Sequence, residues 1–370
     1  MERVAPQRYL KLNNQPLSDL APVANSSISS ISVEEAIGHT GKCEIVFNDT
    51  IDFDLKPNHT KFKTQLSLSL GYPSYLRQVF YGLVVSRELN CDQSDNAKMV
   101  LTAYDLSHQM KIKPPDRIFK ETNLYNVIKK IVDLNGLKFY TDDAEPLRSM
   151  KLEDGKDIAQ VNMTDWEFLS ELTKIVNYRL FCQADTVYAV SEKYTCGDSL
   201  TFIYSPKIDE IDMTKKFPIL SINPRAGMID QRQVVEVISW SEVKEKEYEY
   251  GKQNLDNLSD GSQGYTDIKI QTDAVETLRV SGVATNSAQA KRMAEAELRR
   301  RATDLVSGDV TLIGDPSISI ANKHHFKINA FGLSGQEFEG DYTVWGVRHV
   351  WDGDGFRTEL DLKNNKMKKI

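Results

Sequence analysis

The chain has 370 residues, 40% of them hydrophobic, and no stretch approaches the roughly 18 consecutive apolar residues of a membrane span. Its formal net charge is −7, from 53 acidic and 46 basic residues, which argues against a protein that holds nucleic acid by neutralising phosphates. This length exceeds one ordinary hydrophobic core. We therefore expect about two to four folding units, no membrane anchor and no sequence-specific nucleic-acid partner.

The four cysteines, Cys43, Cys91, Cys182 and Cys196, form no CxxC pair and lie far apart in the sequence. This spacing favours buried free thiols over disulfides or a zinc site. The first six residues carry no apolar signal core. We expect synthesis and folding in the bacterial cytoplasm.

Alternating apolar residues dominate the chain between residues 28 and 106. The alternation is clearest in 43–53, 66–70 and 99–104, and a period of two is typical of strands with one buried face. The pair Pro114-Pro115 interrupts the pattern. Residues 1–115 are therefore expected to form a first β-barrel domain.

Two helices and a hairpin are predicted in residues 116–197. The first helix ends at Asn135-Gly136 and has four apolar residues on one face: Leu124, Val127, Ile128 and Ile131. The second begins with a capping box between Thr164 and Glu167, and its packing residues are Trp166, Phe168 and Leu169. Strands at 178–182 and 186–190 are predicted to pair around Ala184-Asp185. This segment is expected to be an inserted α/β module.

The second half contains a strand, a charged stretch and a long helix. A strand is predicted at 234–240, and the polar residues 242–264 are interpreted as a solvated loop or hairpin arm. The helix begins near Ser287, packs through an alanine-rich stripe that includes Ala294 and Leu298, and is expected to end at Gly308. Its Arg299-Arg300-Arg301 run is interpreted as a solvated face. Residues 198–286 are expected to complete the barrels, and 287–370 to hold the helix and the second barrel segment.

A pattern of strand, glycine, aromatic-glycine and closing strand occurs twice. In the first copy, Leu66, Leu68 and Leu70 alternate before Gly71, and Tyr81-Gly82 is followed by Thr102, Tyr104 and Asp105. In the second copy, Phe326, Ile328 and Ala330 alternate before Gly332, and Trp345-Gly346 is followed by Thr358, Leu360 and Asp361. A glycine beside an aromatic residue in a strand marks a bend or a close backbone approach. The repeat predicts a mainly β protein with two similar barrels, a small α/β module and a long helix; convergent strand chemistry is the alternative.

No catalytic, cofactor-binding or metal-binding residue is expected. Adjacent His324 and His325 point to opposite faces of a strand and do not easily hold one metal. The segment Asp352-Gly353-Asp354-Gly355 begins like a calcium loop, but Arg357 stands where that loop needs glycine, so a hairpin turn is favoured. Nucleophile elbows, phosphate-binding glycine loops and HExxH motifs are missing from the sequence. The four tryptophans are interpreted as core or interface anchors.

The order of these elements resembles the baseplate hub of contractile phage tails, called late control protein D in some phages. It is also similar to the hub portion of type VI secretion spike proteins and of extracellular contractile injection systems. The segments that carry the resemblance are 80–82 with 104–106, 165–169 leading to Tyr178, the helix 288–305, and 340–346 with 356–360. At Asn177 this chain departs from the glycine found in many relatives.

The resemblance implies a homotrimeric ring in which each chain contributes two barrels. Such a ring would adapt a hexameric tail tube protein to a separate trimeric spike protein, contact baseplate wedge proteins, transmit the contraction force and become part of a phage tail or tail-like particle. Two alternatives remain open at this stage. One is a tail-tip adaptor or adhesin of a non-contractile phage, and the other is a tail-associated peptidoglycan hydrolase.

Overall fold

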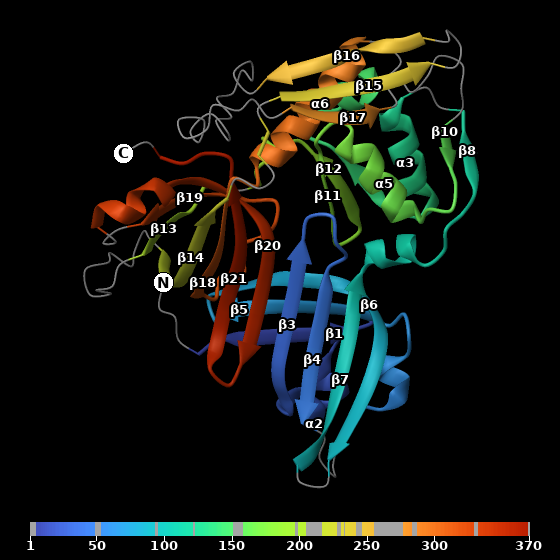
Figure 1. Ribbon diagram of the computed structural model, residues 1–370. Coiled ribbons are helices and arrows are strands. Elements are labelled where there is room, and N and C mark those ends of the chain that lie inside the picture. The colour runs from blue at the N-terminus through green and yellow to red at the C-terminus, as the bar shows by residue number, and fades with distance from the viewer. Residues whose placement is uncertain are drawn as a thin grey trace.

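The computed structural model is mainly β, with its longer helices gathered in the upper part of Figure 1, which confirms the expected fold class. It describes residues 5–48, 53–92, 95–120, 123–150, 158–196, 199–204, 217–227, 231–232, 234–241, 246–254, 277–282, 287–328 and 332–368. Within these ranges, no helix is long and apolar enough to cross a membrane.

The first strand unit, at the bottom of Figure 1, is a curved antiparallel sheet with the spatial order β3-β4-β7-β6-β5-β1-β2. Its strands are β1 (Gln7–Leu12), β2 (Gln15–Pro16), β3 (Ile28–Ala36), β4 (Lys42–Asn48), β5 (Gln65–Tyr72), β6 (Tyr75–Asp92) and β7 (Asp95–Asp105). Two short helices, α1 (Leu17–Leu20) and α2 (Pro22–Ser26), follow β2. The alternating residues Leu66, Leu68 and Leu70 are all fully buried in the unit's core, as their period predicts.

The second strand unit has the spatial order β19-β13-β14-β18-β21-β20, and β19 also pairs with β20. These pairings close a hydrogen-bonded ring of six strands. Its members are β13 (Thr201–Tyr204), β14 (Phe217–Ala226), β18 (Val306–Ile313), β19 (Lys323–Ile328), β20 (Gly340–Asp352) and β21 (Gly355–Asn364). Phe326 and Ile328 are buried inside it, while Ala330 lies outside the described residues. The turn Gly353-Asp354 joins β20 to β21, so the hairpin interpretation is confirmed.

Five strands follow the same plan in both units. In chain order they are β3, β4, β5, β6 and β7 in the first unit, and β14, β18, β19, β20 and β21 in the second. Both sets are arranged first-second-fifth-fourth-third, with antiparallel neighbours throughout. The sixth strand differs, because β1 runs antiparallel to β5 whereas β13 runs parallel to β19 and to β14. The ring closes in the second unit because β13 pairs with both β14 and β19, whereas in the first unit the outer edge of β3 pairs with β20.

The two units share one continuous sheet, because β20 pairs with β3 from Gly346↔Ala36 to Trp351↔Ile31. The tip of the β20–β21 hairpin also enters the first unit: Phe356 belongs to its core, and Trp351 packs against that core. A hydrogen bond of 3.2 Å from the Tyr72 hydroxyl to the Gly314 carbonyl makes a further connection.

The α/β module lies at the upper right of Figure 1 and packs around its own core. Its elements are β8 (Arg117–Phe119), α3 (Leu124–Leu134), β9 (Lys138–Tyr140), α4 (Glu145–Ser149), β10 (Ile158–Gln160), α5 (Asp165–Lys174), β11 (Arg179–Gln183) and β12 (Thr186–Val190). Both predicted helices and the β11–β12 hairpin are confirmed. Asn177, where the resemblance led us to expect glycine, has a φ of 55°, a left-handed conformation that asparagine tolerates.

A separate three-stranded sheet packs against the long helix α6 (Ser287–Ala302). Its strands are β15 (Val234–Ser241), β16 (Lys246–Asn254) and β17 (Thr277–Gly282). Within the predicted charged arm, 246–254 forms β16, whereas 242–245 and 255–264 lie outside the described residues.

Two predictions about α6 are wrong. The helix ends at Ala302, and Gly308 lies inside β18, where strand pairing with β14 and β21 takes over the backbone hydrogen bonds. The arginine run is also less solvated than expected. The exposed fractions of the Arg299 and Arg301 side chains are 15% and 22%, because they bind Glu295 and Glu297 one turn earlier, and only Arg300 reaches 44%.

Candidate functional site

The glycines of the repeated aromatic-glycine pairs occupy the same pairing position in the two units. Gly82 in β6 lies opposite Asp105 in β7, and Gly346 in β20 lies opposite Asp361 in β21. Each pair therefore joins the fourth and fifth strands of its unit.

The two aspartates have different surroundings. Asp105 is buried and accepts hydrogen bonds from the backbone nitrogens of Gly41 (2.5 Å) and Ser107 (2.8 Å) and from the Ser107 hydroxyl (2.5 Å). Burial raises the pKa of Asp105 to about 6 despite these bonds. Burial also raises the pKa of Asp361, which lies opposite Asp309 of β18. Asp105 thus ties the β3–β4 turn to the end of β7.

The close backbone approach that the sequence suggests is present at Gly82 and missing at Gly346. A Cβ atom on Gly82 would lie 2.1 Å from the carbonyl oxygen of Tyr104. On Gly346 the nearest atom would be the Cβ of Asp361 at 3.4 Å, an ordinary contact. The expectation that Gly346 is reserved for a crowded position is therefore wrong, because β20 and its partners leave room there.

The other repeat residues pack in different ways. Tyr81 is partly buried opposite Ser67, and Tyr104 packs on the His108 ring with 4.8 Å between centroids. Trp345 is partly buried and lies beneath the Lys363 ammonium, 4.2 Å from its ring centroid. Leu360 is buried in the second unit's core.

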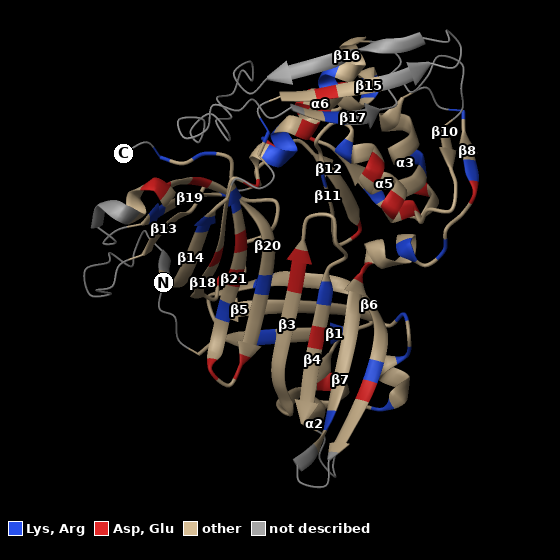
Figure 2. Ribbon diagram, viewed as in Figure 1, with Lys and Arg blue, Asp and Glu red and all other residues tan. Residues whose placement is uncertain are grey.

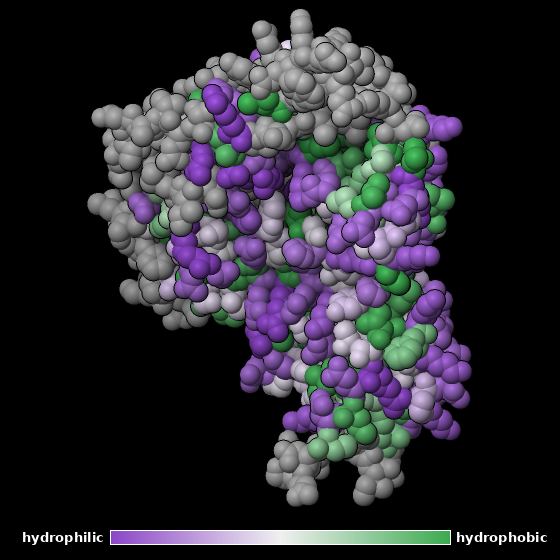
Figure 3. All heavy atoms as spheres, turned by 45° about the vertical axis from the view of Figure 1, so that its right-hand side comes forward, coloured by the Kyte–Doolittle hydropathy of each residue, from purple (hydrophilic) through white to green (hydrophobic). Residues whose placement is uncertain are grey.

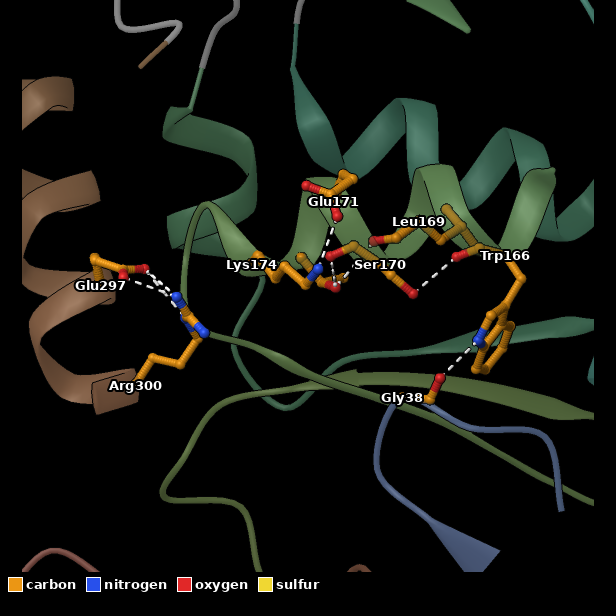
Figure 4. A network of polar contacts seen from close by, with 9 residues as sticks. Gly38, Trp166, Leu169, Ser170, Glu171, Lys174, Glu297 and Arg300 are labelled. Atoms are coloured by element: carbon orange, nitrogen blue, oxygen red, sulfur yellow. Dashed lines mark hydrogen bonds and ion pairs between the residues drawn. The ribbon is translucent and has the colours of Figure 1, made fainter. Parts of the chain in front are cut away.

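Helix α5 connects the α/β module to the first strand unit. The Thr164–Glu167 capping box fixes its first turn, which directs Trp166 toward the β3–β4 loop. The Trp166 Nε1 donates a 3.0 Å hydrogen bond to the Gly38 carbonyl, as Figure 4 shows. Phe168 and Leu169 are buried in the module's own core.

The packing residues of α6 face the small sheet. Ala294 and Leu298 are fully buried with Val235 and Val237 of β15. Charges of both signs lie close together along α6 (Figure 2), and Glu297 binds both Arg300 and Arg301. Figure 4 shows the last turn of α6, with Arg300, in one close view with helix α5 and its residues Lys174 and Trp166.

A cavity of about 280 Å³ lies where these parts meet, and we call it the junction cavity. Gly38 of the β3–β4 loop, Lys174 of α5 and Arg179 of β11 line one part of it. Thr303, after α6, and Trp345 of β20 line another part. The sequence drew attention to Trp345 but not to the cavity, since its walls come from segments far apart in the chain.

Sequence reasoning also missed two ionisable residues: Glu35, where β3 pairs with β20, and Arg179, in the wall of the junction cavity. Burial, together with the charge of Asp105, raises the pKa of Glu35 to about 8. Arg179 is only 5% exposed, and burial lowers the pKa of its guanidinium. The detectable signal was a charged residue inside an otherwise apolar strand pattern, as in Tyr178-Arg179-Leu180-Phe181.

The histidines and cysteines are dispersed. His324 and His349 are buried with pKa values lowered to about 4 by desolvation, while the His325 Nδ1 lies 2.7 Å from an oxygen of Asp341. The opposite orientations of His324 and His325 are as predicted. In the part of the chain that the structure describes, no group of three such side chains could hold a metal ion. All four cysteines are free, but Cys91 and Cys196 are exposed, so expecting all four to be buried was wrong.

Solved structures from three bacteria share this fold. The chain superposes on a tail protein from Neisseria meningitidis MC58 with a TM-score of 0.65 and 11% identity, covering 98% of this chain and 97% of that one. With the 43 kDa tail protein of prophage MuSo2 from Shewanella oneidensis, the TM-score is 0.67 at 11% identity, covering 98% and 100%. An Escherichia coli protein described as a component of the type VI secretion system gives 0.59 at 9% identity, covering 98% and 79%.

At these identities the likeness shows a shared fold, which is the fold of phage tail and type VI secretion proteins. No curated protein matches the chain. The sequence model of one family, described as the Alg8 N-terminal domain, matches residues 18–352, which include the α/β module and most of both strand units but not β1, β2 or β21. The chain belongs to the Alg8 N-terminal domain family.

Proposed function

We propose that this protein is the structural hub of a contractile tail or injection machine. Three chains would form a ring that binds the hexameric tail tube protein on one side and a separate trimeric spike protein on the other, with baseplate wedge proteins around it. The ring would transmit the contraction force and would need no active site.

The observation that carries this proposal is the presence of two strand units with the same five-strand order in one chain. Three such chains present six related units around an axis, which suits a partner with six-fold symmetry and another with three-fold symmetry. The shared fold with phage tail proteins supports the same assignment. Because β20 pairs with β3, load applied to one unit would pass directly into the other through backbone hydrogen bonds.

Exposed apolar side chains offer contact points for partners. Four on or beside the α/β module are more than half exposed: Ile112, Ile118, Leu134 and Val161. The surface in Figure 3 shows small hydrophobic groups separated by hydrophilic residues rather than one continuous apolar area. This pattern is consistent with several moderate contacts, as a hub with different neighbours requires.

The oligomeric state tests the proposal. We expect light scattering at micromolar concentration to show a trimer, alone or after addition of the spike protein encoded beside it, with an interface above roughly 2,000 Å². A chain that stays monomeric with and without the spike protein would contradict the hub assignment. A trimer encoded next to fibre proteins but no sheath protein would favour the tail-tip adaptor instead, and peptidoglycan cleavage by the purified chain would favour a hydrolase.

A further inference from the structure

Two histidines are enclosed in the second strand unit. Of the six histidines in the chain, all of them within the described residues, only His324 of β19 and His349 of β20 are buried, at 0% and 3% exposure. His324 alternates with Phe326 in the burial pattern of β19, and His349 alternates with Val347 in that of β20. Both Phe326 and Val347 belong to the second unit's core. Two groups that take up protons in mild acid when exposed to water therefore lie in an apolar interior.

His324 has no hydrogen-bond partner. Both of its ring nitrogens are buried and meet neither donor nor acceptor among the described residues. The ring packs against Phe202 of β13, with 5.1 Å between the centroids and 65° between the planes. An imidazolium in this place would bury a charge and two N–H donors without an acceptor, which costs much more free energy than a neutral ring. The packing of His324 on Phe202 therefore favours the neutral form.

The partners of His349 also favour its neutral form. Its Nε2 lies 3.3 Å from the Ile318 carbonyl, which only accepts, so this nitrogen carries the hydrogen. Its Nδ1 lies 3.0 Å from the Thr358 hydroxyl. That hydroxyl oxygen accepts from the Asp315 backbone nitrogen at 3.0 Å, which leaves its own hydrogen to point at Nδ1. A proton on Nδ1 would face this hydrogen, so protonation breaks the contact.

One carboxylate lies near both histidines. Among the described residues, the charge that acts on both is that of Asp315, which follows β18. Its Oδ1 already accepts from the backbone nitrogen and the hydroxyl of Ser317, at 2.9 and 2.7 Å. Tyr342 lies opposite His324 on β20 and donates its hydroxyl to the Phe338 carbonyl. Burial outweighs the Asp315 charge and lowers the pKa of both imidazoles to about 4. A single carboxylate cannot neutralise two imidazolium ions.

The strand β13 depends directly on a neutral His324. It has four residues, the fewest in the ring, and within the described residues it pairs with β14 at two positions, Phe202↔Phe217 and Ile203↔Pro218. Its other neighbour is β19, which carries His324. Without β13, the strands β14, β18, β21, β20 and β19 remain joined as an open sheet. Loss of the Phe202 packing would therefore open the ring and leave the other five strands paired.

We propose that the second strand unit is an acid-sensitive ring, which opens at β13 when His324 and His349 take up protons. The opened chain binds these protons more tightly than the closed ring, because a histidine in water has a pKa near 6.5. The stability that depends on the neutral histidines is therefore complete above pH 6.5 and is lost as pH falls toward about 4. The first strand unit has no buried histidine among its described residues, so it should keep its strand pairing. This inference does not depend on the hub assignment, because it concerns the isolated chain.

Hydrogen exchange measured by mass spectrometry at about pH 7.5 and about pH 4.5 tests the opening, with each rate divided by the intrinsic rate at that pH. In the unmodified chain we expect the protection of residues 201–204 to fall about tenfold or more at the lower pH, whereas β4 should keep its protection. In His324→Leu the fall should be severalfold smaller, because leucine fills the site without titrating. This variant should be no less stable than the unmodified chain at about pH 7.5, since it loses no hydrogen bond.

His325→Leu is the matched control, because it removes the adjacent histidine on the other face of β19, whose Nδ1 lies 2.7 Å from an oxygen of Asp341. It should keep the full acid response. If His324→Leu does not fold, His349→Gln replaces it, because an amide can accept from Thr358 and donate to Ile318 but does not titrate. The proposal is overturned if the protection of β13 does not change with pH, or if it falls equally in the folded variant that lacks a buried histidine. Equal losses of protection in β4 and β13 would also overturn it, since they would show unfolding of the whole chain.

Discussion

Glu35 is the residue whose environment departs most clearly from what its sequence position suggests. It lies in β3 between exposed Glu34 and the pairing position Ala36↔Gly346, and it is only partly buried by area. Its carboxyl is nevertheless desolvated at the meeting point of the two strand units and lies near the Asp105 charge, which raises its pKa to about 8. A strand joint between the units thus contains a carboxyl that is protonated at neutral pH.

We expect stability to fall as pH rises from about 4.5 to about 8, and Glu35→Gln to remove part of this fall. The folded chain holds this proton more tightly than the unfolded chain, whose Glu pKa is near 4.5. Its contribution is complete below that value and is lost as pH rises through the folded pKa. We would measure the free energy of unfolding in urea between pH 4.5 and about 8. At the alkaline end, Glu35→Gln should exceed the unmodified chain by on the order of 1–3 kcal/mol. Glu34→Gln is the control, and identical pH slopes for Glu35→Gln and the unmodified chain would contradict this account.

The two repeat glycines should differ sharply in their tolerance of a methyl group. Gly82→Ala places Cβ against the Tyr104 carbonyl and should destabilise by about 3 kcal/mol or more, since β6 and β7 would have to separate. Gly346→Ala meets only ordinary contacts and should change stability by less than about 1 kcal/mol. Denaturant midpoints measure both, and equal losses would show that the apparent space beside Gly346 is not usable.

At the scale of elements, α5 shows how a local signal positions a distant contact. The Thr164 hydroxyl accepts from the Glu167 backbone nitrogen, while the Glu167 carboxylate accepts from the Thr164 backbone nitrogen and hydroxyl. These bonds set the direction of the first turn, and therefore of Trp166, whose indole reaches Gly38. The capping box of α5 therefore helps to hold the α/β module against the first strand unit.

Thr164→Ala should cost about 1 kcal/mol of stability and speed hydrogen exchange at both ends of the Trp166–Gly38 contact. The loss has a local cause, the freed Glu167 nitrogen, and a more distant one, the less constrained Trp166. Glu167→Gln serves as a comparison because an amide can still accept from the Thr164 nitrogen. Faster exchange confined to α5, with residues 37–41 unchanged, would argue against the coupling.

At the scale of the whole molecule, the two units are interlocked rather than adjacent. Phe356 belongs to β21 of the second unit but packs in the core of the first, with its ring centroid 6.2 Å from that of Tyr72. Phe326, by contrast, is buried in the second unit's own core. Replacing Phe356 therefore tests the core of the first unit, and replacing Phe326 tests the core of the second.

Phe356→Ala should destabilise the chain by about 3–5 kcal/mol and raise hydrogen exchange in β1 and β5, far away in sequence. The reason is the cavity left beneath the first unit when the hairpin tip loses its ring. Phe326→Ala should cost a similar amount but raise exchange first in β19 and β13. If Phe356→Ala raised hydrogen exchange only in β20 and β21, the packing of Phe356 in the first unit's core would not contribute to the stability of that unit.

Much of the local structure followed from the sequence alone. Period-two alternation identified buried strand residues such as Leu66 and Phe326, and the Thr164–Glu167 spacing identified the start of α5. These signals are short-range: burial of one face, capping of a helix end and tight turns depend on residues only a few positions apart. The mainly β class and the recurrence of one strand pattern were determined at this level.

Only the tertiary structure decided how these elements combine. The pairing of β13 with both β14 and β19, which closes the ring, and the pairing of β20 with β3 are long-range contacts that no local period encodes. The sequence also could not show that Gly82 is crowded and Gly346 is not, because this depends on how closely a partner strand approaches. The junction cavity and the shifted pKa values of Glu35 and Arg179 arise where separate parts of the chain pack together and exclude water. Burial of these charged groups therefore depends on tertiary packing and not on residue type.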